Sequence, residues 1–299
     1  MSAADLSALQ RPNDRLRRRR VVNRGMELLA WLAAAMAVAI LGIVVWSVAK
    51  RGASQLNLDL LTKTPVSFAI GNVKQGLANA FVGSLVIVGL ATAMALPVGI
   101  LVAIYVNEFA PRAVRRGVGL ALDVLNGVPA IVIGIFVFGL LVVAHGQSAY
   151  AGAFALAVLM LPLVARATIE VLALVPSSLR EASLGLGVPR WRTTLGIVLP
   201  QTVGGIVTGA VLAVARVAGE TAPLLFTSSL VGTTVDWNPG HALQTIPVAI
   251  FELSESPDPA DHARAWAAAL VLLLFILCTS LSARWLATRS RRKLGRAAR

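Results

Sequence analysis

Two opposite charges stand inside an otherwise apolar stretch in the last third of the chain. Arg216 and Glu220 fall within residues 203–226, a stretch long and apolar enough to cross a bilayer. A charge at the membrane centre costs about 2.5–3.5 kcal/mol on insertion scales, so it usually faces a bundle interior or a wet cavity. Because a guanidinium offers two parallel donors to an oxyanion, the pair predicts an anion pathway. Arg216 would bind the anion, and Glu220 would limit the affinity so that the anion can leave.

The spacing of these residues predicts one charged helix face. If residues 203–226 form one helix, Arg216 and Glu220 are i,i+4 neighbours. With about 100° per residue, Gly205, Gly209 and Ala213 share their face within about 80°. Small residues four positions apart let membrane helices pack closely. We expect this face to meet a partner helix and to line the pathway. The alternative is a buried ion pair that only sets the helix register.

Three further polar residues are assigned to the substrate pathway. Thr221 follows Glu220 and adds a hydroxyl donor. Asn126 precedes Gly127 and Pro129, a combination that indicates a broken helix beside the pathway. Ser84, in the second apolar stretch, is assigned to the pathway as well.

The segment 176–200, PSSLREASLGLGVPRWRTTLGIVLP, predicts two short helices joined by a glycine turn. Pro176 suits the start of the first helix, and Pro189 suits the start of the second. Gly187 suits the residue just past a helix end, where φ is often positive. A connection of about 30 residues is long for a loop without a function.

No arrangement typical of an enzyme is found. The chain lacks the nucleotide-binding pattern G-x-x-x-x-G-K-[ST], a Ser-His-Asp set and a paired-carboxylate site. The histidines are scattered, and Cys278 stands alone in an apolar run, which argues against a metal site or a disulfide framework. We therefore expect a non-catalytic chain that binds no cofactor and no metal.

The elements that carry these residues are membrane-spanning helices. Of the 299 residues 57% are hydrophobic and only 14% are charged, which excludes an ordinary soluble enzyme and a disordered chain. The net charge of +13 gathers largely at the two ends, beside apolar runs, so it indicates membrane topology and not nucleic-acid binding. The sequence predicts an all-α membrane protein with six spans, at about 28–49, 79–105, 120–144, 149–169, 203–226 and 265–287.

The distribution of charge predicts that both termini are cytoplasmic, in the plasma membrane. Basic residues gather in the arm 1–27, the loop 106–117, the segment 170–200 and the tail 288–299, whereas 227–263 is acidic. Residues 28–287 would form one permease domain. The basic residues of 50–78 disagree with this topology, but long segments are weaker signals. A cleaved signal at residues 47–49 is the alternative, although the apolar run before it is longer than a signal needs.

The segment 176–200 resembles the EAA motif of the ABC importer permeases. The pattern E-A-A, G, I-x-L-P is matched by Glu181-Ala182-Ser183, Gly187 and Ile197-Val198-Leu199-Pro200, with Ser183 as the departure. The resemblance implies a fold like that of type I importer permeases, with a cytoplasmic coupling helix–turn–helix that docks on an ATPase. Glu181 would make the polar contact, and Ala182 and Gly187 would allow close approach. Ser183 and Arg190 belong to the same coupling surface.

Three other segments are similar to the phosphate importer permeases of the PstA family: ARVAGETAPLLFTS at 215–228, LNGVPAIVIGIFVFG at 125–139 and LPVGILVAIYVNEF at 96–109. The resemblance implies half of a phosphate pathway. It also implies a PstC-like second permease, two PstB-like ATPase subunits that hold ATP and Mg, and an external PstS-like phosphate-binding protein. Membrane lipid would surround the spans.

Three alternatives stay open. The chain could serve another oxyanion, such as phosphonate, sulfate or molybdate, because the EAA pattern does not select the substrate. It could be an ATP-independent channel or secondary carrier, which segment 176–200 argues against. A role in phosphate signalling could coexist with transport.

Overall fold

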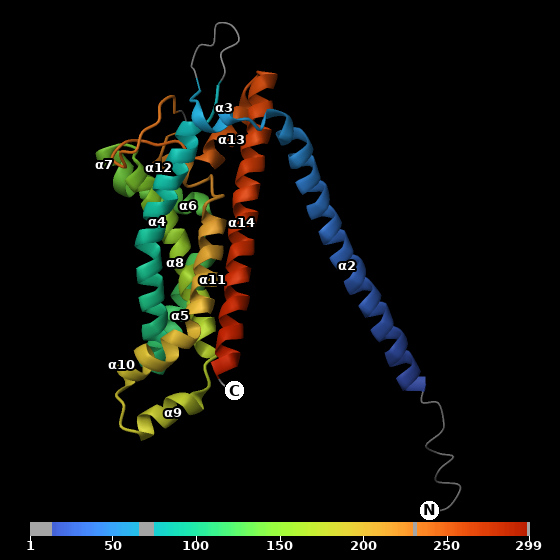
Figure 1. The fold of residues 1–299 in the computed structure, drawn as a ribbon, viewed down its shortest axis with the longest axis vertical. Coiled ribbons are helices and arrows are strands. Elements are labelled where there is room, and N and C mark those ends of the chain that lie inside the picture. The colour runs from blue at the N-terminus through green and yellow to red at the C-terminus, as the bar shows by residue number, and fades with distance from the viewer. Residues whose placement is uncertain (1–13, 66–74, 230–231, 298–299) are drawn as a thin grey trace, which may run out of the picture. The chain divides into compact units, whose positions relative to one another are not determined.

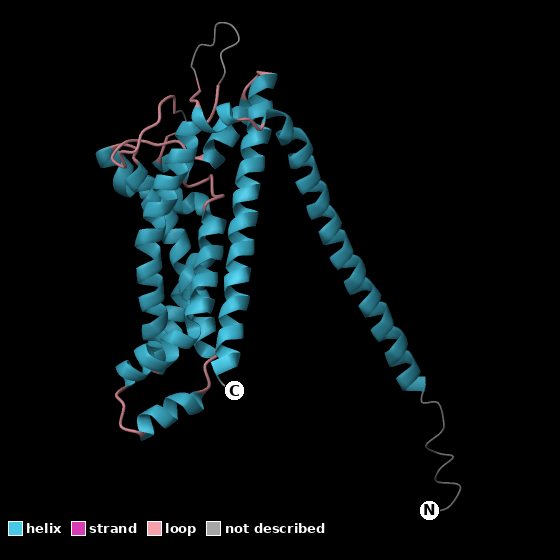
Figure 2. Ribbon diagram, in the orientation of Figure 1, coloured by secondary structure: helices cyan, strands magenta, loops and turns pink. Residues whose placement is uncertain are grey.

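The computed structural model describes the backbone of residues 14–65, 75–229 and 232–297, with side chains described between 18 and 285. Every regular element in these ranges is helical (Figure 2), which confirms the predicted all-α class. The chain divides into two units, Met1–Lys50 and Arg51–Arg299. The first unit holds most of helix α2 (Asp14–Gly52), whose apolar side chains are largely exposed.

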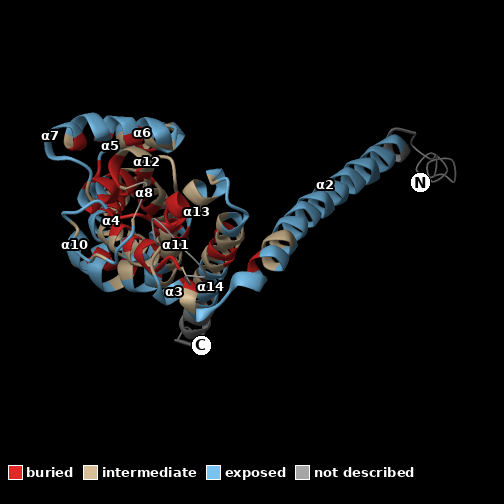
Figure 3. Cartoon of the chain, turned by 90° about the horizontal axis from the view of Figure 1, so that it is seen from above, coloured by how far each residue is buried: buried red, intermediate tan, exposed pale blue. Residues whose placement is uncertain are grey.

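The second unit is built around four long helices: α4 (Ala78–Ile104), α8 (Ala149–Ala173), α11 (Leu199–Val217) and α14 (Pro259–Ala297). α8 packs against both α4 and α11, and α11 packs in turn against α14 (Figure 1). Figure 3 shows many buried residues on α8 and α4, whereas α5 carries mostly exposed residues.

Small residues allow α4 and α8 to approach closely. Ala91, Ala95 and Gly99 follow one another at four-residue spacing on α4, and all three are buried. A Cβ on Gly99 would lie 2.9 Å from Val164 Cγ1 of α8, so only glycine fits there without movement. This spacing is typical of tightly packed membrane helices, and it makes the α4–α8 pair a rigid unit.

The third predicted span is a bent pair of helices. α5 (Arg112–Gly127) meets the helical segment Ala130–His145, which begins as α6 (Ala130–Val137), at an angle of 95° across Val128 and Pro129. The π-helical segment η3 (Phe138–Val142) and α7 (Val143–His145) continue it. This bend confirms the break predicted at Asn126-Gly127-x-Pro129. Its physical cause is that proline disfavours a helical conformation of the residue before it.

Short elements lie at the two ends of the bundle. α9 (Ser177–Gly185) and α10 (Arg190–Thr193) lie at the end opposite to α3 (Leu58–Thr62), α12 (Leu224–Thr227) and α13 (Ile246–Glu255) (Figure 1). The remaining short segments are η1 (Ala53–Gln55), η2 (Tyr105–Phe109) and η4 (Thr194–Val198).

The predicted spans are confirmed in number but not in every boundary. Five helices in the described ranges are long and apolar enough to cross a membrane, and the bent pair α5–α6 gives a sixth. The fifth prediction, 203–226, is wrong beyond Val217, where α11 ends. Residues 14–27 of the predicted arm are helical and continuous with the first span, while 1–13 and 298–299 lie outside the described residues.

Candidate functional site

The segment 176–200 forms the predicted helix–turn–helix. Pro176 directly precedes α9, Pro189 directly precedes α10, and Gly187 between them has φ +79°. The N–H of Gly187 donates to the carbonyl of Leu184 and that of Val188 to Ser183, which is the Schellman pattern of helix ends. The glycine is needed for its positive φ, since an added Cβ would meet nothing within 4 Å.

The residues assigned to ATPase coupling divide between an exposed and a buried side of this element. Glu181, Ala182 and Arg190 are exposed, as a docking surface requires. Ser183 is buried, and its hydroxyl lies 2.8 Å from that of Thr193, so it ties α9 to α10. The departure from the usual E-A-A pattern at Ser183 therefore adds a hydrogen bond within the element.

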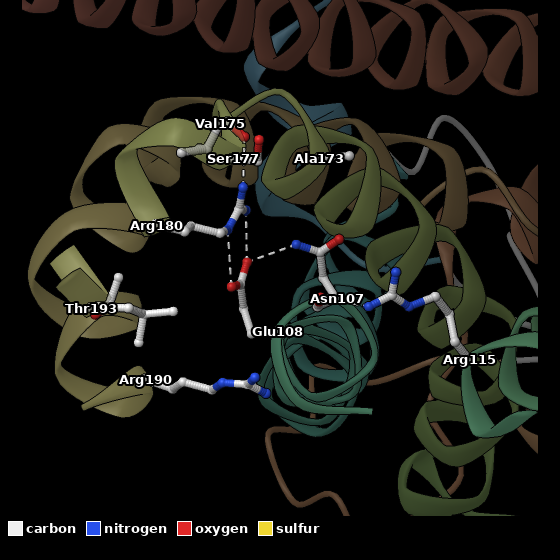
Figure 4. A pocket seen from close by; sticks show the side chains of 10 residues that line it. Asn107, Glu108, Arg115, Ala173, Val175, Ser177, Arg180, Arg190 and Thr193 are labelled. Atoms are coloured by element: carbon white, nitrogen blue, oxygen red, sulfur yellow. Dashed lines mark hydrogen bonds and ion pairs between the residues drawn. The ribbon is translucent and has the colours of Figure 1, made fainter. Parts of the chain in front are cut away.

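An ion pair that the sequence did not predict lies where this element meets the bundle. Arg180 of α9 contacts Glu108 of η2, with Nη2 2.8 Å from Oε1 and Nε 3.1 Å from Oε2. Figure 4 shows both side chains pointing into a cavity of about 510 Å³ that Asn107, Arg115 and Arg190 also line. Glu108 is a lone carboxylate among the arginines after the second span, and this was its only sequence signal.

Arg216 and Glu220 do not form the predicted helical pair. α11 ends at Val217, and the N–H of Glu220 donates to the Val217 carbonyl in a turn. The premise of i,i+4 neighbours is therefore wrong, because Gly219 and Pro223 interrupt the helix. Arg216 is exposed in the last turn of α11, whereas Glu220 and Thr221 are half-buried in the turn. The ion pairs found among the described residues do not include Arg216 with Glu220.

The small residues of the fifth span do meet a helix, and that helix belongs to the same chain. A Cβ on Gly209 would lie 2.7 Å from Ala167 Cβ, and one on Gly205 would lie 2.5 Å from Val171 Cγ1, both on α8. The predicted close packing is confirmed for this face, because α8 fills the space that the glycines leave.

The segment that follows α11 packs against α6, the helix after the other break. Pro223 stands in the unwound segment after α11, and its Cα would lie 2.6 Å from a Cβ on Gly134 of α6. Asn126 is exposed in the last turn of α5, at the edge of the other break. Backbone that leaves a helix at membrane depth needs other partners or a wet cavity, and the segment after α11 lies against α6.

The surroundings of Ser84 differ from those of the other residues assigned to the pathway. Its hydroxyl accepts a hydrogen bond of 2.8 Å from the N–H of Ile246, at the start of α13. It lines an apolar cavity of about 480 Å³ whose walls include Phe81, Val214 and Phe275. The bond gives Ser84 a role in capping α13, and the apolar walls offer an anion no other strong donor.

Polar side chains at the α13 end form a network. Asn79 Nδ2 lies 2.8 Å from Gln244 Oε1, and Gln244 donates in turn to Glu252. Burial raises the pKa of the Glu252 carboxyl, the Gln244 hydrogen bond opposes that rise, and the charge of Asp261 adds to it. In the described ranges, no three His, Cys, Asp or Glu side chains gather as a metal site.

Comparison with known proteins gives a consistent family. Residues 95–292 match the family described as binding-protein-dependent transport system inner membrane component. The chain is 37% identical to phosphate transport system permease protein PstA of Haemophilus influenzae over 270 residues, covering 89% of this chain and 94% of the relative. It is 43% identical to phosphate transport system permease protein PstA 1 of Mycobacterium tuberculosis H37Rv, covering 73% and 72%.

Solved structures share the fold. A chain from a crystal structure of a bacterial alginate ABC transporter is similar with a TM-score of 0.63 and 16% identity, covering 90% of this chain and 96% of that one. A chain of the inward-facing MetNI methionine ABC transporter gives a TM-score of 0.56 and 16% identity, covering 71% and 93%. At this identity the likeness concerns the fold alone.

Proposed function

The chain belongs to the PstA family of phosphate transport permeases within the binding-protein-dependent inner membrane components, and from this premise we propose how its parts serve import. It acts as a permease subunit of an ABC importer for inorganic phosphate. Its bundle forms half of the translocation pathway, and its helix–turn–helix couples the bundle to a cytoplasmic ATPase. The chain itself catalyses no reaction and binds no cofactor, since ATP and Mg belong to the ATPase.

The observation that carries the coupling role is the construction of segment 176–200. α9 and α10 are braced to each other by Ser183 and Thr193 while Glu181, Ala182 and Leu186 stay exposed. A braced element with an exposed polar and apolar surface suits docking on another protein, because it loses little conformational freedom on binding. Two PstB-like subunits would supply the docking clefts, one for this chain and one for a PstC-like permease.

Arg216 is the residue that suits contact with phosphate. Its guanidinium is exposed in the last turn of α11, where the chain leaves the helix, and can offer two parallel donors to an oxyanion. Glu220, in the following turn, lowers the affinity for an anion and so permits release. Thr221 lies in the turn after α11, and Asn126 lies in the last turn of α5. The bond from Ile246 makes Ser84 the weakest member of the proposed set. A PstC-like subunit would cover the exposed face and complete the path.

The expected cycle is alternating access. Closure of the ATPase dimer on ATP pushes α9 and opens the path outward, where a PstS-like protein delivers phosphate. Hydrolysis resets the path inward. This order requires both termini and α9 to be cytoplasmic, as the basic residues of the arm, of 106–117 and of 170–200 indicate.

The decisive experiment is ATP-driven uptake of labelled phosphate by vesicles that contain all four components. We expect uptake that requires ATP and the external binding protein, with unlabelled phosphate competing and sulfate and phosphonate failing to compete. Competition by another oxyanion as strong as that of phosphate would assign the chain to that substrate. Uptake by the purified chain without an ATPase would overturn the importer assignment in favour of a channel or secondary carrier.

A further inference from the structure

Arg180 is the side chain that fastens α9 to the membrane-spanning helices. In the part of the chain that the structure describes, the side-chain hydrogen bonds of α9 run to α10 through Ser183 and to the bundle through Arg180. In the view of Figure 1, α9 lies below the long helices of the bundle. Movement of α9 therefore reaches the bundle either through Arg180 or through the chain segments at its two ends.

One planar group holds three elements together here. The Arg180 guanidinium donates to both carboxylate oxygens of Glu108, which lies in η2 at the end of α4. The same group donates to the carbonyl of Leu172 at 2.9 Å and to that of Val175 at 2.6 Å. The Leu172 carbonyl lies in the last turn of α8, where a helix carries partial negative charge, and Val175 lies in the turn that follows. The contacts thus fix α9 to the ends of α4 and α8 at once.

The carboxylate is itself braced. Asn107 Nδ2 donates to Glu108 Oε1 at 2.7 Å, and Arg115 of α5 donates to the carbonyls of Val106 and Asn107 at 3.0 Å (Figure 4). The side chain of Glu108 is 9% exposed and that of Arg180 22% exposed, so salt screens the pair only weakly. A bidentate pair with a supported partner holds one geometry and transmits displacement better than a flexible contact.

We propose that Glu108 and Arg180 form the joint that passes movement of the coupling element into α4 and α8. Both are positioning residues that touch neither phosphate nor ATP. The inference rests on the proposed function, in which α9 docks on an ATPase through surfaces that begin at Glu181, the residue after Arg180. Because α4 and α8 are packed through small residues, a shift at their shared end moves the pair as one body.

The test measures phosphate uptake and ATP hydrolysis in the same vesicles, reconstituted from the four-component complex. The variants are Glu108→Gln, Arg180→Gln and the double variant, with Arg116→Gln of the same cytoplasmic region as the control. We expect each single variant to assemble, to hydrolyse ATP, and to lose roughly two- to thirtyfold in phosphate moved per ATP. The double variant should lose no more than either single one, because both remove the same contact. Arg116→Gln should match the wild type.

Arg180→Lys keeps the positive charge but removes the planar guanidinium with its paired donors. A single ammonium cannot meet all four oxygens of Glu108, Leu172 and Val175, so we expect a ratio between those of the wild type and Arg180→Gln. The proposed joint would be wrong if the losses in phosphate moved per ATP added up in the double variant. It would also be wrong if the ratio were unchanged in Glu108→Gln, or if uptake and hydrolysis fell together with the amount of assembled complex. A wild-type complex that hydrolyses ATP without moving phosphate would instead overturn the proposed function.

Discussion

Arg216 has two physical roles open to it at its position in the last turn of α11. A cation there is favourable for the helix by itself, because the final carbonyls carry partial negative charge. Lysine would serve that purpose equally well, whereas only arginine presents a planar fork to an oxyanion. The comparison of the two side chains therefore separates helix stabilisation from anion recognition.

We expect Arg216→Lys to raise the phosphate concentration for half-maximal uptake about tenfold, because the variant loses one charge-assisted hydrogen bond to phosphate. The measurement is the initial rate of ATP-driven uptake against phosphate concentration. Arg284→Lys, at an exposed arginine of α14, is the matched control and should change nothing. If Arg216→Lys shows the same dependence of uptake rate on phosphate concentration as the wild type, the residue only stabilises the end of α11.

Glu252 gives the structure a dependence on pH. Burial raises its pKa, so the folded state holds the proton more tightly than the unfolded chain, in which the usual value is 4.5. The free energy of unfolding should therefore fall as the pH rises from about 4.5 through the raised pKa. Glu252→Gln keeps an acceptor for Gln244 and should remove this fall. The midpoint of thermal unfolding in detergent, measured across that range, tests it.

Glu255 supplies the control for that series, because it ends the same helix and is exposed. Glu255→Gln should reproduce the wild-type dependence on pH. If Glu252→Gln and the wild type lose stability in parallel as the pH rises, the burial of Glu252 contributes nothing measurable.

At the scale of elements, local signals explain which parts could be predicted. The helix–turn–helix was predicted correctly because proline and glycine act within a few residues, as at Pro176 and Gly187. The end of α11 was missed because apolar residues continue to 226, although Gly219 and Pro223 already indicated a break. The Glu108–Arg180 pair joins residues 72 positions apart, so no local pattern could reveal it.

Two glycines of the coupling element allow a clean test of the turn. Gly187 has φ +79°, whereas Gly185 is helical, and a Cβ on either would meet nothing within 4 Å. We expect Gly187→Ala to strain the turn by about 1–2 kcal/mol and to lower ATP-driven uptake. Gly185→Ala should leave uptake unchanged, since alanine is the better helix former. Equal effects of the two substitutions in reconstituted vesicles would rule out the role of the positive φ.

The contact between α11 and α8 can be tested by compensation. Gly209→Ala places a Cβ 2.7 Å from Ala167 Cβ, and neither atom can rotate away. We expect a destabilisation of about 1–3 kcal/mol, seen as a lower midpoint of thermal unfolding. Ala167→Gly in the same chain should restore part of the loss. Gly196→Ala, where nothing lies within 4 Å, is the control, and a loss of the same size there would contradict steric crowding at Gly209.

At the scale of the whole molecule, the exposed surfaces of the chain indicate contact with lipid and with other subunits. Large apolar side chains are exposed along α2 and also on α5 and α6, among them Trp31, Leu120 and Phe136. Lipid can cover such surfaces, but the exposed charge of Arg216 in the last turn of α11 cannot face acyl chains without cost. The second permease proposed above would cover Arg216 and so complete a pathway between the two subunits.

The orientation of the chain decides whether the coupling element can reach an ATPase. Ser178 of α9 and Ser254 of α13 are exposed at opposite ends of the bundle (Figure 1). We would place single cysteines there as Ser178→Cys and Ser254→Cys, in a Cys278→Ser background that removes the native thiol. In right-side-out vesicles a membrane-impermeant maleimide should label Ser254→Cys directly and Ser178→Cys only after detergent is added, because the basic segments predict that α9 is cytoplasmic. Labelling of Ser178→Cys in intact vesicles would place α9 outside, where no ATPase could act on it.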